Sequence, residues 1–259
     1  SPEHGSYVET YITILGNSLF FELDENGKYF ATVETTILIK QNDEIVDFEK
    51  LILKSPEIDD TSSVTFSIVD VQRFVLPNGE YDIEIIIKDK NSNKGKINFY
   101  DSFSLNYNSD ILTLSGIQLV ERYEKSETQG VLSKAGYNII PLPINFFPKS
   151  INSLAFYCEI YNAINDLGQD EKFLIKAYLE YFETQNMVKD IVFVKREQAR
   201  DVNVFLHEFD ISKLASGNYF LVVEIRDRNN ELKSINKQFV QRSNPIADED
   251  LFAKDMSYE

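Results

Sequence analysis

The chain has 259 residues, 43% of them hydrophobic, and its 42 aspartates and glutamates exceed its 26 lysines and arginines, which gives a formal net charge of −16. Because this charge repels nucleic acid and anionic lipid surfaces, we expect a protein, a glycan or a cation as partner and no nucleic acid. The single cysteine excludes an internal disulfide framework, and no run of about 18 to 20 apolar residues predicts a membrane-spanning segment.

The first part of the chain is a series of short segments rich in β-branched and aromatic residues, which predicts strands. Asn and Gly in gaps such as 24–27 and 41–43 tolerate the positive φ of tight hairpins. Seven strands in about 105 residues have the size of an immunoglobulin-like sandwich. The expected strands are 7–15, 18–23, 29–40, 45–53, 63–69, 81–89 and 96–105.

A polar segment, 106–110, follows the last of these strands. We therefore expect a first sandwich at 1–108 and a second at 109–244, with a polar insertion or mobile loop near 126–136. Three prolines interrupt the apolar stretch 139–147 and its end, which predicts a strand at a sheet edge because proline lacks the ladder donor. The strands expected in the second sandwich are 112–123, 139–147, 153–161, 173–183, 189–195, 202–209, 219–227 and 234–241.

The two ends of the chain carry separate expectations. Ile246, Leu251 and Phe252 have helical spacing, which predicts that a helix or linker begins within 245–259 and continues past the end of the chain. The chain begins without an initiator methionine, so we expect that processing or trimming has removed an upstream segment.

A repeat organises the whole sequence. The segment 76–91 recurs without a gap as 214–229, at an offset of 138 residues, and predicts two copies of one β-domain. We thus expect an all-β fold of two tandem antiparallel β-sandwiches, immunoglobulin-like or fibronectin-III-like. Extended upstream, the same offset pairs Val64, Phe66 and Ile68 with Val202, Val204 and Leu206 as core-facing residues.

The repeated Leu-x-x-Gly-x-Tyr pattern is typical of a tyrosine corner, in which a phenol bonds back to upstream backbone and fixes the crossover between sheets. A structural role for these tyrosines is a stronger interpretation than ligand stacking. The residues of the two predicted corners are Leu76, Gly79 and Tyr81, and Leu214, Gly217 and Tyr219.

Catalytic chemistry has little support in the sequence. By the repeat, His207 aligns with Val69 on the outward face of its strand, and the other histidine, His4, lies near the start. No nucleophile elbow occurs, and Cys158 alternates with core-facing residues as an inert thiol. One cysteine and two distant histidines cannot form a closed zinc site. We expect no enzyme activity and no cofactor.

Two polar segments deserve a separate test as cation sites. Asp89 and Asn91 open an acidic-x-Asn-x-Asn rhythm, and Asp227 and Asn229 follow the equivalent strand. Lys94 stands where a calcium loop needs glycine, so both are better interpreted as hairpin turns, with a weak cation site as the alternative.

Aromatic residues supply the remaining candidate site. Tyr157 and Tyr161 lie on the face opposite Cys158, Tyr178 lies in a neighbouring strand, and the proline-broken edge carries two phenylalanines. Together they form a candidate patch for a partner or ligand, although covered sheet faces produce the same pattern. The patch residues are Tyr157, Tyr161, Tyr178, Phe146 and Phe147.

Four segments, 8–11, 54–57, 72–81 and 250–252, give the chain a family resemblance. It resembles the N-terminal region of GWxTD domain-containing proteins of Bacteroidetes. The Gly-Trp-x-Thr-Asp motif itself is absent, because the chain contains no tryptophan. The resemblance implies an exported protein, in the periplasm, attached to the cell envelope or secreted, with a role in interaction or assembly. It transfers no catalytic residue.

Three functions stay open from the sequence. The first is a non-catalytic scaffold or interaction module that binds another envelope protein. The second is a carbohydrate- or small-ligand-binding protein that uses the domain junction, around 106–110 and 126–136. The third is an enzyme with a carboxylate pair, which no motif supports. The fold alone does not choose among them.

Overall fold

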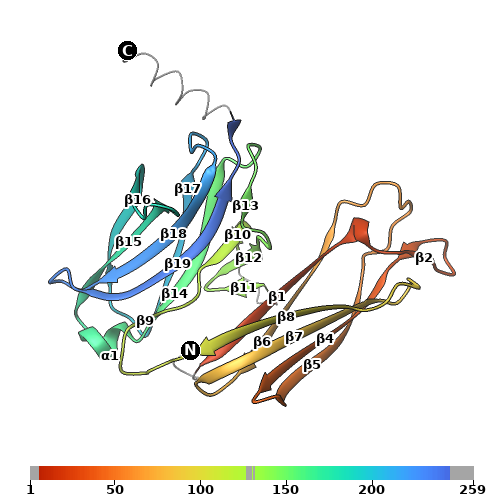
Figure 1. Ribbon diagram of the computed structural model, residues 1–259, viewed down its shortest axis with the longest axis horizontal. Coiled ribbons are helices and arrows are strands. Elements are labelled where there is room, and N and C mark those ends of the chain that lie inside the picture. Colours follow the sequence, from red (N-terminus) through yellow and green to blue (C-terminus); the bar gives the residue numbers. More distant parts are fainter. Residues whose placement is uncertain (1–5, 127–129, 131, 246–259) are drawn as a thin grey trace. The chain divides into compact units, whose positions relative to one another are not determined.

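The computed structural model describes residues 6–126, 130 and 132–245. The chain divides into two compact units, an N-terminal sandwich that ends at Tyr107 and a C-terminal sandwich that begins at Asn108. This division falls within the polar segment 106–110. Figure 1 shows the first unit in red to yellow and the second in green to blue, each built mainly of strands.

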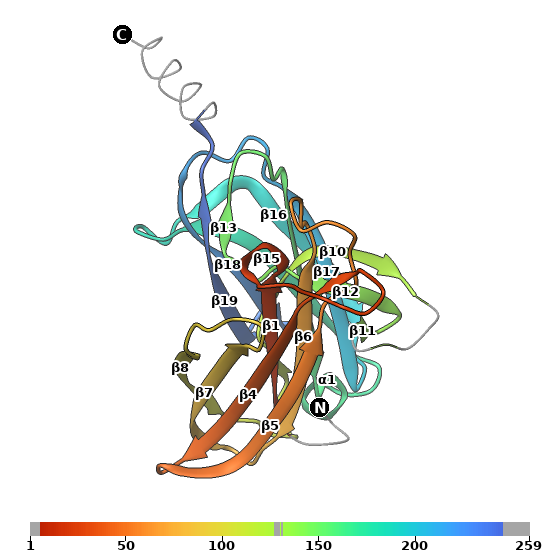
Figure 2. The same cartoon turned by 90° about the vertical axis from the view of Figure 1, so that its right-hand side faces the viewer.

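The N-terminal sandwich contains two main antiparallel sheets. One has the order β5-β4-β7-β8, whose strands lie side by side in Figure 2, and the other pairs β1 with β6. A short β2-β3 ribbon completes the unit. The elements are β1 (Tyr7–Leu15), the 3-10 helix η1 (Gly16–Ser18), β2 (Glu22–Leu23), β3 (Tyr29–Phe30), β4 (Thr32–Gln41), β5 (Glu44–Lys54), β6 (Ser67–Val75), β7 (Gly79–Asp89) and β8 (Ile97–Leu105).

The alternation of β4 shows how the two sheets meet. Val33, Ile37 and Ile39 are fully buried, because successive side chains of a strand point to opposite faces and these three share one face. They pack with Ile12 of β1 and Phe74 of β6. The core of this unit therefore lies between the two sheets.

The C-terminal sandwich also has two sheets. One has the order β11-β12-β10-β14-β17, with β9 added to β14, and the other has the order β13-β19-β18-β15-β16. The elements are β9 (Thr113–Leu114), β10 (Gln118–Lys125), β11 (Ser133–Lys134), β12 (Tyr137–Pro141), β13 (Phe146–Phe147), β14 (Ser153–Tyr161), α1 (Ala163–Leu167), β15 (Lys172–Tyr181), β16 (Met187–Gln198), β17 (Val202–Asp210), β18 (Gly217–Arg226) and β19 (Leu232–Arg242).

The core of the C-terminal sandwich is rich in aromatic rings. Phe156 of β14 stacks on Phe209 of β17 at 5.9 Å and meets Phe205 edge-on at 5.4 Å. Ile175 and Val223 of the other sheet belong to the same buried cluster. Burying such rings is a large part of the hydrophobic free energy available to a domain of this size.

Six strands correspond between the two units. The sheet β5-β4-β7-β8 matches β16-β15-β18-β19 in order, and the pair β1-β6 matches β14-β17. The predicted fold class, an all-β chain of antiparallel β-sandwiches, is confirmed. The C-terminal sandwich has five further strands. β9, β10, β11 and β12 extend the sheet of β14, and β13 pairs with β19.

Both predicted tyrosine corners have the expected hydrogen bond. The Tyr81 hydroxyl donates to the backbone carbonyl of Pro77 at 2.9 Å, and the Tyr219 hydroxyl donates to that of Ala215 at 3.0 Å. A Cβ on Gly217 would lie only 3.3 Å from the Tyr219 ring, and one on Gly79 would lie 2.6 Å from the Gln41 amide. The glycines therefore give the backbone room to approach. Leu76 and Leu214, before each corner, are buried.

The upstream extension of the repeat is wrong. β6 runs over Ser67–Val75 instead of 63–69, and the connection to the next strand has three residues in the N-terminal unit but six in the C-terminal one. The offset between these two strands is therefore 135. An odd shift exchanges the two faces of a strand, so Phe205, His207 and Phe209 face the core while Val202 and Val204 are exposed.

The segment 139–147 also differs from the single edge strand predicted. It divides into β12, which pairs with both β10 and β11, and β13, which lies at the edge of the other sheet. Pro141 stands at the last position of β12, where a missing donor does not interrupt the ladder. The predicted insertion, 126–136, contains β11, and its residues 127–129 and 131 lie outside the described residues, as does the helix expected after 245.

Candidate functional site

The residues of the predicted aromatic patch do not form an exposed surface. Tyr157, Tyr161, Tyr178 and Phe147 are all buried, and only Phe146, at 40% exposure, is open to solvent. Tyr157 lies in a second apolar cluster on the outer face of its sheet, with Val120 and Ile139 beside it. The prediction assumed that the face opposite the core is solvated, whereas added strands give this sheet apolar residues on both faces.

Tyr178 belongs to a hydrogen-bonded network on the outer face of the other sheet. Its hydroxyl donates to Glu224 at 2.6 Å, and Arg226 donates to the other carboxylate oxygen at 2.8 Å. Burial raises the pKa of Glu224, but these two hydrogen bonds outweigh it and hold the pKa below the ordinary value. Burial and the bond to Glu224 raise the pKa of Tyr178. Both carboxylate oxygens of Glu224 therefore have hydrogen-bond donors, and we interpret the network as structural.

His207 lies on the core-facing side of β17, not on the outward face predicted. Its ring is 4.0 Å from the Phe193 ring and 4.8 Å from the Phe209 ring. Burial among these rings lowers the pKa of His207, and the adjacent Glu208 offsets this only in part. A neutral histidine packed among aromatic rings has a structural role.

Cys158 is fully buried in the same core, as predicted. Burial raises the pKa of its thiol, because the thiolate would have to form in an apolar environment.

The two candidate cation turns use their carboxylates to accept backbone hydrogen bonds. Asp89 accepts the backbone N–H groups of Asn91 and Phe20, and Asp227 accepts those of Asn229 and Glu231. These are Asx-type turns, in which the side chain fixes local backbone. In the described part of the chain, no three His, Cys, Asp or Glu side chains come together as a group that could hold a metal ion.

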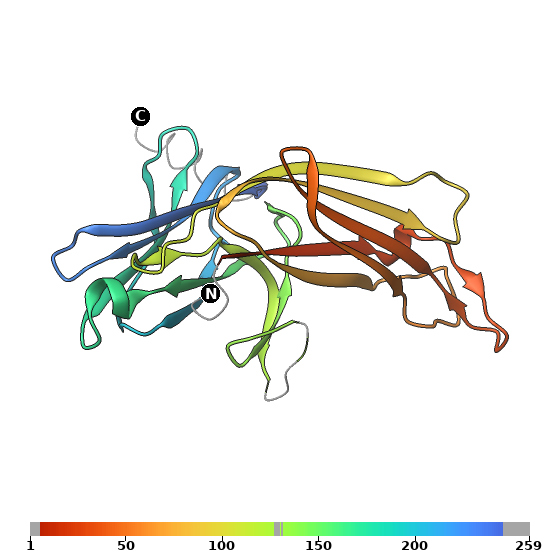
Figure 3. The same ribbon diagram turned by 90° about the horizontal axis from the view of Figure 1, so that it is seen from below.

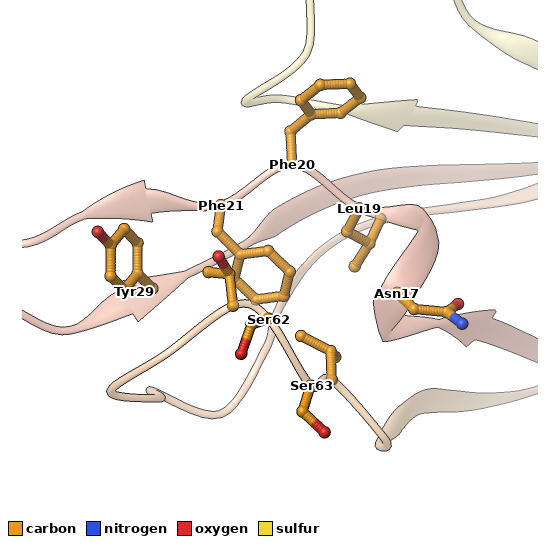
Figure 4. Close-up of a pocket in the computed structure, with 9 residues that line it drawn as sticks. Asn17, Leu19, Phe20, Phe21, Tyr29, Ser62 and Ser63 are labelled. Atoms are coloured by element: carbon orange, nitrogen blue, oxygen red, sulfur yellow. The ribbon is translucent and has the colours of Figure 1, made fainter.

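The N-terminal sandwich contains a cleft at one end, which the sequence did not indicate. Two loops form its walls, the turn after β1 and the segment before β6, with β3 beside them. Its volume is about 520 Å³, within the range of ligand pockets. This N-terminal cleft, drawn in Figure 4, is lined by Asn17, Leu19, Phe20, Phe21, Tyr29, Thr61, Ser62, Ser63 and Val64.

Backbone contacts fix the walls of the cleft. The Gly16 N–H donates to the Phe66 carbonyl at 3.0 Å, and a Cβ on Gly16 would lie 2.7 Å from that oxygen. Phe21 meets Phe66 edge-on at 6.3 Å. The Tyr29 backbone exchanges hydrogen bonds of 2.8 and 2.9 Å with Ile58. Because position 16 is glycine, the turn after β1 can approach the segment before β6 closely, and this contact fixes the two walls of the cleft.

A second feature of the N-terminal sandwich lies on β8, in the β7-β8 hairpin drawn in gold and yellow in Figure 3. Ile97 and Phe99 pair with Ile87 and Ile85 of β7, whose side chains pack on the core. Although they share this core-facing side, Ile97 is 58% exposed and Phe99 is 54% exposed. We call these two residues, together with the edge of β8, the open flank.

The corresponding flank of the C-terminal sandwich is covered. β13 pairs with β19, so that the N–H of Gln241 donates to Asn145 at 2.8 Å and that of Ser243 donates to Phe147 at 3.0 Å. The core-facing Asn236 donates to the carbonyl of Ser115 at 3.0 Å. The C-terminal sandwich thus uses its own chain where the N-terminal one presents apolar side chains to solvent.

No signal in one sequence distinguishes these two flanks. Segment 96–105 was predicted as a strand, but its exposure depends on which strands lie opposite it. The alternative site at the domain junction stays a prediction, because neither sandwich by itself tests it. Among the described residues, no helix combines the length and apolar character needed to cross a membrane.

The chain was compared with known proteins. No protein-family model matches it, and no curated protein matches it. Among solved structures, it is similar to a glycosyl hydrolase family 2 member from Bacteroides cellulosilyticus, with 11% identity and a TM-score of 0.30 over 91% of this chain and 26% of that one. It is also similar to a β-glucuronidase of Bacteroides uniformis, with 9% identity and a TM-score of 0.32 over 91% and 26% of the two chains. The chain spans about a quarter of the length of either structure.

Proposed function

We propose that this chain is a non-catalytic interaction module, in which the open flank of the N-terminal sandwich receives an extended segment of a partner protein. The observation that carries the proposal is the exposure of Ile97 and Phe99 on the core-facing side of an edge strand. An edge strand offers unpaired backbone donors and acceptors, and a partner strand can use both these and the apolar side chains.

The second copy of the sandwich supports this mode of binding. There, two residues of β13 add to β19, and Phe147 is buried by doing so. Register with the preceding strand makes Ser104 and Leu105 of β8 the counterparts of Gln241 and Arg242. A partner strand at these positions would give the N-terminal sandwich the edge pairing that the C-terminal sandwich obtains from its own chain.

Charge suggests the chemistry of the partner. Acidic residues outnumber basic ones by two to one between residues 4 and 107. A basic partner segment would be attracted to this unit, and its association rate would fall as salt rises. The resemblance to the N-terminal region of GWxTD domain-containing proteins favours another envelope protein as this partner, encountered in the periplasm or at the cell surface.

Site-specific photocrosslinking tests the proposal. A photoreactive amino acid is placed at Phe99 and, as matched control, at Ile235, an exposed residue of β19. Each chain is mixed with detergent-solubilised envelope of the source organism. We expect position 99 alone to crosslink one protein through an extended segment, less efficiently at high salt. Equal crosslinking at both positions, or crosslinks only to a second copy of this chain, would contradict the proposal.

A further inference from the structure

We infer that the N-terminal cleft is a binding site for the end of a neutral carbohydrate. None of its nine lining residues carries a charge, although acidic residues are abundant elsewhere in this unit. The lining itself offers an anionic ligand no lysine or arginine and a cation no carboxylate, although Lys94 lies over the Phe20 ring and Asp60 accepts a hydrogen bond from Ser62. The lining therefore fits an uncharged molecule that combines apolar faces with hydroxyl groups.

The polar groups of the cleft are available to such a ligand. Asn17, Thr61 and Ser63 line it, and among the described residues their side chains make no hydrogen bond. An amide supplies both donors and an acceptor, and each hydroxyl supplies one donor and two acceptor positions. Ser62, in contrast, donates to Asp60 at 2.5 Å, which fixes the loop. Three uncommitted groups on fixed walls can thus meet the hydroxyls of a sugar.

Aromatic rings supply the apolar faces. Figure 4 shows the Phe21 ring directed toward Ser62, with Tyr29 at one end of the cleft and Asn17 at the other. A flat ring buries a large apolar area, and a sugar ring has C–H groups that can lie against it. Aromatic rings and polar side chains thus line the same cleft.

Phe20 also lines the cleft, but its ring points away from the others in Figure 4. The ammonium group of Lys94, a residue in the turn between β7 and β8, lies over the Phe20 ring at 5.2 Å from its centre. Phe20, Phe21 and Tyr29 are therefore neighbouring aromatic residues of which only the last two offer their rings to a ligand.

The test is titration calorimetry of the whole chain with glucose, galactose, mannose, N-acetylglucosamine and a β-linked disaccharide of each, at up to about 10 mM. We expect at least one neutral sugar to bind with a Kd in the millimolar range or below. Phe21→Leu and Tyr29→Leu should each weaken that binding at least fivefold, and Thr61→Val about threefold. Phe48→Leu, at an exposed ring of β5 that does not line the cleft, should leave it unchanged.

Two results would overturn the inference. The first is that no neutral sugar binds at these concentrations to a chain that melts normally, or that glucuronic acid alone binds. The second is that Phe21→Leu and Tyr29→Leu bind the sugar as the parent chain does. Thermal melting of each variant separates lost binding from lost folding. Photocrosslinking at position 99 is independent of all four substitutions, so this inference and the proposed function can fail separately.

Discussion

The two sandwiches share six strands and differ in what surrounds them. In the C-terminal sandwich β13 pairs with the last strand, and Ser234 and Asn236 of that strand form hydrogen bonds with Leu114 of β9 and with the adjacent Ser115. In the N-terminal sandwich the matching strand carries Ile97 and Phe99, and both are exposed. The difference teaches that the repeated strands determine the fold, whereas the added segments decide which surface is left for a partner.

The cores of the two units also differ, and a core substitution should separate them most sharply. Phe156→Ala removes a fully buried ring from the C-terminal core and should cost about 3–5 kcal/mol of the free energy of unfolding. Scanning calorimetry should show a large fall in the melting temperature of that unit, with the transition of the N-terminal unit unchanged. Phe146→Ala, at a partly exposed ring, is the control and should change stability little. Equal shifts of both units would contradict the assignment of Phe156 to the C-terminal core alone.

The two tyrosine corners should contribute equally to the free energy of unfolding of their sandwiches. Tyr81→Phe and Tyr219→Phe each leave a backbone carbonyl without its donor and should destabilise the sandwich that contains them by about 1–3 kcal/mol. Urea denaturation followed by unit-specific probes measures this. Tyr29→Phe removes a hydroxyl at the cleft with no backbone bond to lose, and should change the midpoint less. Unchanged curves for both corner variants would refute their structural role.

Acid should distinguish the two units through His207. Because burial lowers the folded-state pKa of this residue, its contribution to stability is complete above the unfolded-state pKa of about 6.5 and is lost as pH falls through the folded-state pKa. We expect the C-terminal unit to lose more stability than the N-terminal one between pH 7 and 5. His207→Phe should remove the difference in this window. If both units of the parent chain lose the same stability between pH 7 and pH 5, the proposed role of His207 is wrong.

The smallest effect on stability should come from the open flank. Phe99→Ser replaces a half-exposed ring and should change the free energy of unfolding by less than about 0.5 kcal/mol, since surface positions rarely contribute more. Chemical denaturation checks this. A loss of several kcal/mol would mean that Phe99 is buried in the folded chain, and the open flank would not exist.

Much of the fold could be predicted from the sequence, because a local pattern of β-branched and aromatic residues indicates a strand. The segments 7–15, 153–161 and 202–209 match β1, β14 and β17 within one residue at each end. The corner motif was readable for the same reason, since its leucine, glycine and tyrosine are close in sequence. The orientation of β17 was not, because a three-residue difference in one connection reversed its two faces.

Exposure was the property that the sequence could not supply. Tyr157 and Phe99 both alternate with other apolar residues in a strand, yet Tyr157 is buried and Phe99 is open. What decides between them is how many strands lie against each sheet, which is a tertiary property. The cleft was hidden for a related reason. Its walls come from segments about 45 residues apart, 16–21 and 61–64, that only the fold brings together.

Native-state hydrogen exchange of the free chain tests the difference between the two flanks most directly. In the C-terminal unit the amides of Gln241 and Ser243 donate to β13 and should exchange slowly. Ser104 and Asn106 of the N-terminal unit are their counterparts in register and should exchange at least tenfold faster, because β8 has no strand on that side among the described residues. Equally slow exchange at all four amides would show that the chain already covers β8, which would remove the docking site on which the proposed function rests.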